Sequence, residues 1–248
     1  MFLSRVPVNE MSRAFRRDYA DVHDMHRTLM SVFGEAGVDA AARRHHGLLW
    51  RMDEVGVARV GEGTAARSLL VQSRVRPDWT RLPHGYASGR IKVTCLQPVL
   101  AAAVPGGRFA FRLVANPTRS TPPVGGAPGG RARGKRRPIH DPEEQVAWLI
   151  RQGERHGFVI PTASDGAPDA AAEPRPALVG RKVDQRSKAR GDSRLKISIL
   201  PAAFAGRLIV TDPGAFSEAV KEGIGRAKAY GCGLMGLEPD LSAVRRAS

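Results

Sequence analysis

The pattern of apolar and polar positions predicts strands and helices in an order that occurs twice along the chain. In the first half, short apolar or alternating runs bounded by glycine, proline or polar residues predict five strands, over 2–8, 48–55, 68–75, 90–96 and 108–115. A helix is predicted over 14–33, because its apolar residues fall on one face, and a shorter one over 98–104. The first half therefore has the approximate order β-α-β-β-α-β.

The second half repeats this order. Helices are predicted over 142–157, where Asp141 is a good N-cap and Pro142 suits the first helical position, and over 213–222. Strands are predicted over 158–160, 178–183, 194–200, 204–210 and 232–237. The repeat of the pattern predicts an α+β fold made of tandem ferredoxin-like (RRM-like) domains. We place an N-terminal domain at 1–117, a flexible linker or loop at 118–136 and a C-terminal domain at 137–248.

Two tracts contain few apolar residues to bury. Residues 118–133 are rich in proline, glycine and arginine, which is typical of a mobile loop or linker. Residues 161–176 form a second tract of low complexity.

Charge narrows the class of partner. The chain has 39 Lys and Arg against 24 Asp and Glu, a formal net charge of +15, so a polyanion is the expected partner. Arginine-rich composition alone would scatter the cations along the chain. Here they cluster in 131–137 and in 175–196, which favours nucleic acid.

The cluster in 175–196 coincides with two predicted strands, which we expect to form a basic hairpin. Such a ribbon can lie along an RNA stem and contact phosphates. The alternative is a solvent-exposed edge ribbon with no partner. The candidate RNA-binding residues of the ribbon are Arg181, Lys182, Arg186, Lys188, Arg190, Arg194 and Lys196.

A glycine-rich basic loop near the C-terminus is the second candidate nucleic-acid site. Gly223 and Gly225 allow close approach of the backbone to a phosphate chain, and Arg226 and Lys228 make the loop cationic. A P-loop-like match at 129–135 lacks the magnesium-binding Ser or Thr and follows no strand. The G-x-G-x-x-G match at 231–236 leaves too little chain for a dinucleotide-binding unit, so we expect both to be accidental.

Two histidines on the first predicted helix are the candidate catalytic residues. His26 falls at the edge of the apolar face, where its tip can reach a cleft, and His23 lies one step nearer solvent. Such an imidazole suits general acid–base catalysis near neutral pH. The alternative is a core-edge histidine that hydrogen-bonds a backbone carbonyl. No HExxH motif and no third ligand accompany the pair, so we expect no metal and no cofactor.

RNA cleavage needs little more than such an imidazole. The 2′-OH of RNA is its own nucleophile, so an enzyme must deprotonate it, protonate the leaving 5′-oxygen and stabilise charge on phosphorus. Arg27, beside His26, and the cations of the glycine-rich loop are candidates for the last task.

Other features point to a cytoplasmic protein. Cys95 and Cys232 lie far apart in apolar contexts, where we expect buried free thiols. The N-terminus does not resemble a signal peptide, and no apolar run is long enough to span a membrane.

We expect Trp50, Trp79 and Trp148 to pack in the interior rather than stack on bases.

At these residues the chain resembles the CasE family, the CRISPR RNA-processing endoribonucleases of type I-E CRISPR systems. The matching segments run through nearly the whole chain in order. They are 1–9 (MFLSRVPVN), 25–30 (MHRTLM), 49–51 (LWR), 69–73 (LLVQS), 77–79 (PDW), 111–118 (FRLVANPT), 134–136 (GKR), 209–214 (IVTDPG) and 223–234 (GIGRAKAYGCGL). The last two segments are the most specific.

The resemblance implies tandem ferredoxin-like domains and a metal-independent nuclease that cleaves precursor CRISPR RNA at the 3′ base of a repeat hairpin. It also implies 2′,3′-cyclic phosphate products, and a protein that stays on its mature guide RNA with the other subunits of Cascade in antiviral defence. The family's catalytic histidine falls on His26. Some relatives carry a tyrosine three residues earlier, where this chain has His23, and the family's stem-gripping hairpin falls on 181–196.

Two rival functions remain open at this point. In one, the protein is a non-catalytic structural RNA-binding subunit of a ribonucleoprotein, and His26 is structural. In the other, it is a basic protein that binds duplex DNA.

Overall fold

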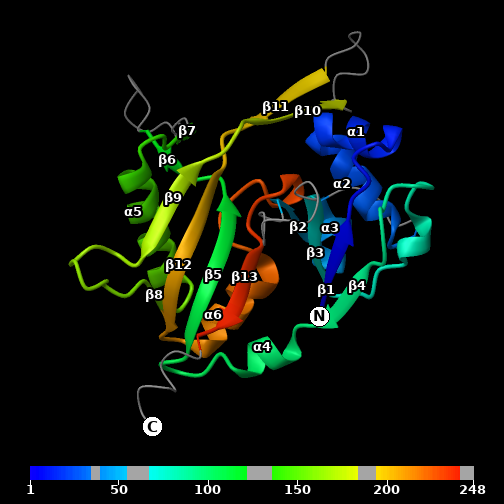
Figure 1. Ribbon diagram of the computed structural model, residues 1–248. Helices are drawn as coiled ribbons and strands as arrows, with labels where there is room; N and C mark the ends of the chain where they lie inside the picture. The colour runs from blue at the N-terminus through cyan, green and yellow to red at the C-terminus, as the bar shows by residue number, and fades with distance from the viewer. Residues whose placement is uncertain (35–39, 55–66, 122–135, 184–193, 241–248) are drawn as a thin grey trace, which may run out of the picture.

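The computed structural model describes residues 1–34, 40–54, 67–121, 136–183 and 194–240 (Figure 1). Its helices are α1 (Arg13–Ala20), α2 (Val22–Ser31), α3 (Ala40–His46), α4 (Gln97–Ala101), α5 (Pro142–Arg155) and α6 (Pro213–Glu222), with short 3₁₀ helices η1 (Trp79–Arg81) and η3 (Lys228–Tyr230). Its strands are β1 (Phe2–Pro7), β2 (Leu49–Glu54), β3 (Arg67–Ser73), β4 (Lys92–Cys95), β5 (Arg108–Ala115), β6 (Thr118–Ser120), β7 (Arg136–Pro138), β8 (Phe158–Val159), β9 (Ala170–Pro174), β10 (Leu178–Val183), β11 (Arg194–Ile199), β12 (Ala202–Val210) and β13 (Met235–Pro239).

The N-terminal sheet is antiparallel with strand order β2-β3-β1-β4. Its first strand lies between its third and fourth, and its second lies at the edge, which is the ferredoxin-like arrangement. Helices α1 and α2 place Phe15, Met25 and Leu29 in one core with Val6 and Val71 of the sheet. The sheet therefore supports helix α2, which carries both candidate histidines.

The C-terminal sheet has the order β13-β5-β12-β8, and β9 also pairs with β12. Taken in chain order, these strands repeat the arrangement of the N-terminal sheet. The alternation along β5 buries every second side chain, and helices α5 and α6 cover the sheet with Trp148, Leu149 and Phe216. Two similar antiparallel units, each with its own core, account for the α+β architecture.

One strand of the first predicted unit was assigned to the wrong sheet. Residues 108–115 do form a strand, but β5 pairs with β12 and β13 of the C-terminal sheet, and β4 is the fourth strand of the N-terminal one. Helix α4 accordingly follows the first sheet instead of lying between two of its strands. Alternation predicts a strand and its buried face but not its partner. The domain limits at 117 and 137 stay a prediction.

Four further expectations were wrong in detail. The helix predicted over 14–33 is two helices that meet at Asp21. Within the tract 161–176, β9 forms a regular strand against β12, and the last strand begins at Met235 instead of Cys232. Cys232 is buried as expected, but Cys95 is exposed. The tract 118–133 lies mostly outside the described residues.

Polar side chains of the N-terminal sheet join the two units. Buried Arg51 pairs with Asp53 and donates hydrogen bonds to the carbonyl oxygens of Arg112 and Leu234, at 2.7 and 3.3 Å. Buried Gln72 donates to the carbonyl of Val220 at 2.8 Å. A buried charged group is tolerated only when such partners satisfy it, so these contacts fix how the units meet.

The basic ribbon lies apart from both sheets. Strands β10 and β11 pair with each other in antiparallel register, with Arg181 opposite Lys196, which confirms the predicted hairpin. In Figure 1 the ribbon extends from the C-terminal unit across to helices α1 and α2 of the N-terminal one. Cationic side chains are thereby carried over the helix that holds the histidines.

Candidate active site and nucleic-acid interface

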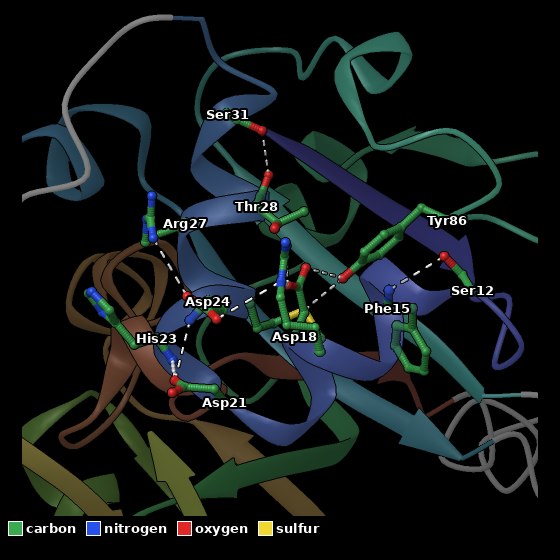
Figure 2. Close-up of polar contacts among 12 residues, drawn as sticks. Ser12, Phe15, Asp18, Asp21, His23, Asp24, Arg27, Thr28, Ser31 and Tyr86 are labelled. Carbon is green, nitrogen blue, oxygen red and sulfur yellow. Dashed lines mark hydrogen bonds and ion pairs between the residues drawn. The ribbon is translucent and has the colours of Figure 1, made fainter. Parts of the chain in front are cut away.

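Helix α2 begins at a side-chain cap that fixes its first turn. The carboxylate of Asp21 accepts hydrogen bonds from the backbone N–H groups of His23 and Asp24, at 2.8 and 3.4 Å (Figure 2). Asp21 has extended backbone angles, so it ends α1 and starts α2. The acidic residue three positions later was a sequence signal for this helix start, and the prediction of one continuous helix missed it.

His26 is more enclosed than the sequence predicted. Only 3 % of its surface is exposed, so its tip does not reach an open cleft, and that expectation was wrong. Its ring lies 6.2 Å from the ring of Tyr230, edge to face. Helical periodicity placed His26 at the margin of the apolar face, but the loop that covers that margin comes from the other end of the chain.

His23 is half-buried and lies beside the same tyrosine, with the ring centroids 6.4 Å apart. Burial lowers the pKa of His23, and the nearby charges of Lys182 and Arg27 lower it further, while Asp21 opposes them. The neutral imidazole is therefore favoured near neutral pH. Its Nδ1 is buried and has no hydrogen-bond partner among the described residues.

Tyr230 was not a candidate from the sequence, although it belongs to the glycine-rich segment 223–234. It stands at the end of η3, and burial raises the pKa of its phenol, as does the charge of Asp21. The indole Nε1 of Trp50 donates to the carbonyl of Ala229 at 3.0 Å and so holds η3 against strand β2. No pattern in the sequence around residue 230 indicated that its partners are histidines about 200 residues earlier.

The basic ribbon is attached to helix α2 at the same aspartate. The second carboxylate oxygen of Asp21 accepts a hydrogen bond from the backbone N–H of Arg181 at 3.0 Å. Gly180 makes this approach possible, because a Cβ there would lie 2.6 Å from Asp21 Oδ1 and 3.2 Å from the backbone N of His23. Asp21 therefore couples the position of the ribbon to the first turn of the helix.

The described part of the ribbon presents its cations to solvent. The side chains of Arg181, Lys182 and Lys196 are exposed, and Arg194 begins strand β11. Three other candidates, Arg186, Lys188 and Arg190, lie outside the described residues. Exposed cations along a two-stranded ribbon suit contacts to a phosphate backbone.

The glycine-rich loop takes backbone conformations that side chains disfavour. Gly223 and Gly225 have φ values of 79° and 81°. Of the two cations in the loop, Arg226 is exposed and Lys228 is half-buried. Burial lowers the pKa of Lys228, and the charge of Arg43 does so as well. The loop therefore combines close packing of its backbone, Gly223 against Leu49 and Gly225 against Trp148, with positive potential.

Arg27 follows His26 on helix α2 and has 61 % of its side chain exposed. Its guanidinium lies 3.7 Å from the carboxylate of Asp24, one turn earlier. In Figure 2 the side chains of His23 and Arg27 project to one side of the helix, and Asp18 and Tyr86 lie on the other. Arg27 can therefore contact an anion on the His23 side.

A buried polar cluster supports the helix from its other side. The carboxylate of Asp18 accepts a hydrogen bond from the hydroxyl of Tyr86 at 3.0 Å and pairs with Arg17 at 2.7 Å. The same hydroxyl contacts the sulfur of Met25 at 3.2 Å. Because Asp18 is fully buried, losing either partner would leave a poorly compensated charge in the core. The cluster thus holds α1, α2 and the loop of Tyr86 together.

The three tryptophans pack as expected. Trp50 and Trp148 are buried, and Trp79 is partly buried with its Nε1 donating to Ser4 Oγ. Within the described ranges, no group of three or more His, Cys, Asp or Glu residues is placed so that it could hold a metal ion. None of the helices in these ranges is long and apolar enough to span a membrane.

Comparison with known proteins identifies relatives along nearly the full chain. A family model described as CRISPR associated protein matches residues 1–239. The CRISPR-associated endoribonuclease Cse3 of Thermus thermophilus is 33% identical over 239 residues, which cover 96% of this chain and 100% of that protein.

Solved structures agree with the sequence relatives. A structure of CRISPR endoribonuclease Cse3 bound to a 19 nt RNA matches with a TM-score of 0.72 and 30% identity, covering 96% of this chain and 100% of that one. Thermus thermophilus Cse3 bound to an RNA representing a pre-cleavage complex matches with a TM-score of 0.68 and 32% identity, over 96% and 98% of the two chains. Together with the strand orders, these matches confirm the tandem ferredoxin-like fold.

Proposed function

Because the chain belongs to the CRISPR associated protein family and is similar to Cse3 along its length, we propose that it is an endoribonuclease of CRISPR RNA maturation. It cleaves precursor CRISPR RNA within repeat hairpins, gives mature guide RNA and stays bound to it as a Cascade subunit in the cytoplasm. The RNA-bound structures of its relatives support the choice of substrate class.

One observation carries this proposal. The ribbon and the histidine helix are joined at Asp21, which accepts hydrogen bonds from the backbone N–H of His23 at the start of the helix and from that of Arg181 in the ribbon. A stem held by the ribbon is thereby placed beside the two imidazoles. The RNA-binding ribbon and the histidines are then held in a fixed position relative to each other, which is required to place one phosphodiester linkage at the imidazoles.

The proposed reaction needs no cofactor. The 2′-oxygen attacks the adjacent phosphorus, the bond from phosphorus to the 5′-oxygen breaks, and a 2′,3′-cyclic phosphate and a 5′-hydroxyl result. His26 serves as general acid or base for one of these two proton transfers, and His23, whose neutral form is favoured, takes part in the other. Arg27, Arg226 and Lys228 stabilise charge on the phosphate and contact its neighbours.

His26 reaches the linkage only if its cover moves. The ring lies under Tyr230 at the end of η3, and η3 begins after Ala227, whose φ of 59° is the single positive value for a non-glycine residue among the described residues. Such a conformation stores strain and is typical of functional loops. We infer that a bound RNA displaces this segment and takes the place of the Tyr230 ring beside His26.

Incubation of the protein with a labelled repeat hairpin in EDTA tests the function. The hairpin is taken from the CRISPR array of the same genome, and DNA of the same sequence serves as the matched control. We expect a single cut in the RNA, a 2′,3′-cyclic phosphate end and no cut in the DNA. RNA that is bound but stays uncut would contradict the proposal that the protein is an endoribonuclease.

A non-catalytic RNA-binding subunit is the second candidate, and the burial of His26 is the observation that favours it. In that case the ribbon binds the hairpin and the imidazole only fills space in the core. This candidate predicts tight binding of the hairpin without cleavage under any condition. A duplex-DNA-binding protein would instead bind the DNA and RNA hairpins with similar affinity.

A further inference from the structure

A cavity of about 610 Å³ lies on the side of the glycine-rich loop toward helix α5. Helix α5 forms one wall, β6 and β7 form another, and the loop closes the third. Its cationic and imidazole side chains are those of Arg119, Arg136, Arg151, Arg155, His156, Arg226 and Lys228. Only Arg226 and Lys228 of this set were candidates from the sequence, because the others come from three separate segments.

The cavity is positively charged throughout. The described residues that line it include no acidic side chain. Arg119 is partly neutralised by Glu144, 3.1 Å away, but none of the ion pairs found in the described part of the chain involves Arg151, Arg155 or Arg226. Burial lowers the pKa of His156, and the charges of Lys228 and Arg155 lower it further, which shows that the positive groups act on one another. An anion bound among them relieves this repulsion.

Part of the cavity is lined by the backbone of the glycine-rich loop and by the indole of Trp148, which offers little surface on which a base could stack. Trp148 is buried, and one face of its ring stacks on Phe204 with the ring centroids 5.8 Å apart, so little of the indole is open to a base. A Cβ at Gly225 would lie 3.2 Å from the Trp148 ring, so the glycine lets the loop lie close above it. Such a site contacts phosphates and does not distinguish bases.

The same loop connects the cavity to the imidazoles. Lys228 lines the cavity and begins η3, and Tyr230 at the end of η3 lies beside His23 and His26. An RNA chain whose cleaved phosphodiester lies at the histidines therefore needs to cross only this loop to enter the cavity. The ribbon, in contrast, lies on the α1 and α2 side (Figure 1).

We propose that this cavity binds the phosphodiester backbone of single-stranded RNA adjoining the hairpin. The inference rests on the proposed function, since it takes the substrate to be a repeat hairpin with unpaired flanks. Pockets of roughly 300–1,000 Å³ each hold one small ligand, so the cavity fits a short flexible stretch of strand and excludes a stem. A flank held here adds affinity that is independent of the flank's sequence.

The test compares three RNAs that carry a 2′-deoxynucleotide before the cleaved linkage, so that only binding is measured. They are the stem-loop alone, the stem-loop with a 5′ single-stranded flank and the stem-loop with a 3′ flank. The variant is Arg151→Ala with Arg155→Ala, which removes two exposed cations from α5. The control is Arg90→Ala with Arg108→Ala, which removes the same charge from two exposed residues that do not line the cavity.

We expect the cavity variant to lose the extra affinity that one of the flanks gives the wild type, about tenfold, and to bind the bare stem-loop as tightly as the wild type does. With that flank, the salt dependence of binding should also flatten by about 1.4 in slope, for two single-strand phosphate contacts. The control variant should match the wild type on all three RNAs.

Two results would overturn the proposal. One is an equal loss on all three RNAs, which would make the cavity part of the stem contact, and the other is no loss on any of them. Either result leaves cleavage of the unmodified hairpin in EDTA intact. Failure of the cavity is therefore distinguishable from failure of the nuclease, in which the unmodified hairpin stays uncut.

Discussion

The two sides of the glycine-rich loop differ in what they expose. On the α2 side, Tyr230 covers His26 and half-covers His23, and the pKa of His23 is lowered by burial. On the α5 side, the cations Arg151, Arg155 and Arg226 are exposed around a cavity. Imidazoles kept from water and fixed in place suit proton transfer, whereas exposed cations suit attraction of a polyanion. Changes to the imidazoles should therefore alter the cleavage rate, and changes to the exposed cations of α5 and of the ribbon should alter affinity.

The largest effect is expected from His26→Ala. Loss of a general acid or base lowers the rate by about 10²–10⁴. We expect this loss in single-turnover cleavage with RNA saturated by protein, while the dissociation constant for the hairpin stays unchanged. Because His26 is buried, thermal unfolding of the variant must be measured in parallel. His84→Ala, at an exposed loop residue, is the control. Undiminished cleavage by a folded His26→Ala protein would remove this residue from the reaction.

A smaller effect, on affinity, is expected from the ribbon. Replacing Arg181, Lys182 and Lys196 together by alanine should weaken hairpin binding by about 10- to 100-fold and flatten its salt dependence by about 2.7 in slope, for three duplex phosphate contacts. The cleavage rate at saturating protein should change little. Filter binding at several salt concentrations measures both quantities. An unchanged slope would show that the ribbon does not contact the RNA.

Gly180→Ala should lower both the cleavage rate and the affinity for the hairpin, because the residue lies where the ribbon contacts helix α2. The new Cβ would lie 2.6 Å from Asp21 Oδ1, so the ribbon must shift away from the cap of α2. Such overpacking typically costs about 1–3 kcal/mol, and we expect a loss of about tenfold shared between affinity and cleavage rate. Val179→Ala, at the exposed neighbour, should leave both unchanged. A loss in neither quantity would argue against coupling through Asp21.

The smallest effect concerns pH and the cavity. Burial and the charges of Lys228 and Arg155 hold the pKa of His156 below 6.5, and a bound phosphate should raise it. Binding of the correctly flanked RNA then takes up a proton, so affinity should rise as pH falls below about 6.5, by at most about tenfold for each unit of pKa difference. Dissociation constants measured from about pH 5 to about pH 8, the range in which histidine titrates, check this dependence. His156→Gln should abolish it; an unaltered pH profile in that variant would assign the dependence to another group.

Local features of the chain were predictable, and long-range ones were not. The cap at Asp141, the ribbon strands and the glycine-rich loop depend on neighbouring residues, so their patterns were sufficient. The pairing of β5 with β12 and the cover of Tyr230 over His26 depend on segments far apart in sequence.

The hydrogen bond between Asp21 and Arg181 joins residues 160 positions apart, and no local pattern encodes it. The cavity was missed for the same reason, since its cations come from α5, β6, β7 and the loop, which no local pattern shows to be neighbours. Clustering in sequence found the ribbon, but clustering in space was needed to find the second cationic site.

The most direct test of the central claim replaces one atom of the substrate. A repeat hairpin with a single 2′-deoxynucleotide before the cleaved linkage has no nucleophile for a histidine to activate. The wild-type protein in EDTA should bind this RNA as tightly as the unmodified hairpin and leave it uncut, while the unmodified hairpin is cleaved to a 2′,3′-cyclic phosphate. Cleavage of the deoxy-substituted hairpin at the same linkage would contradict the account.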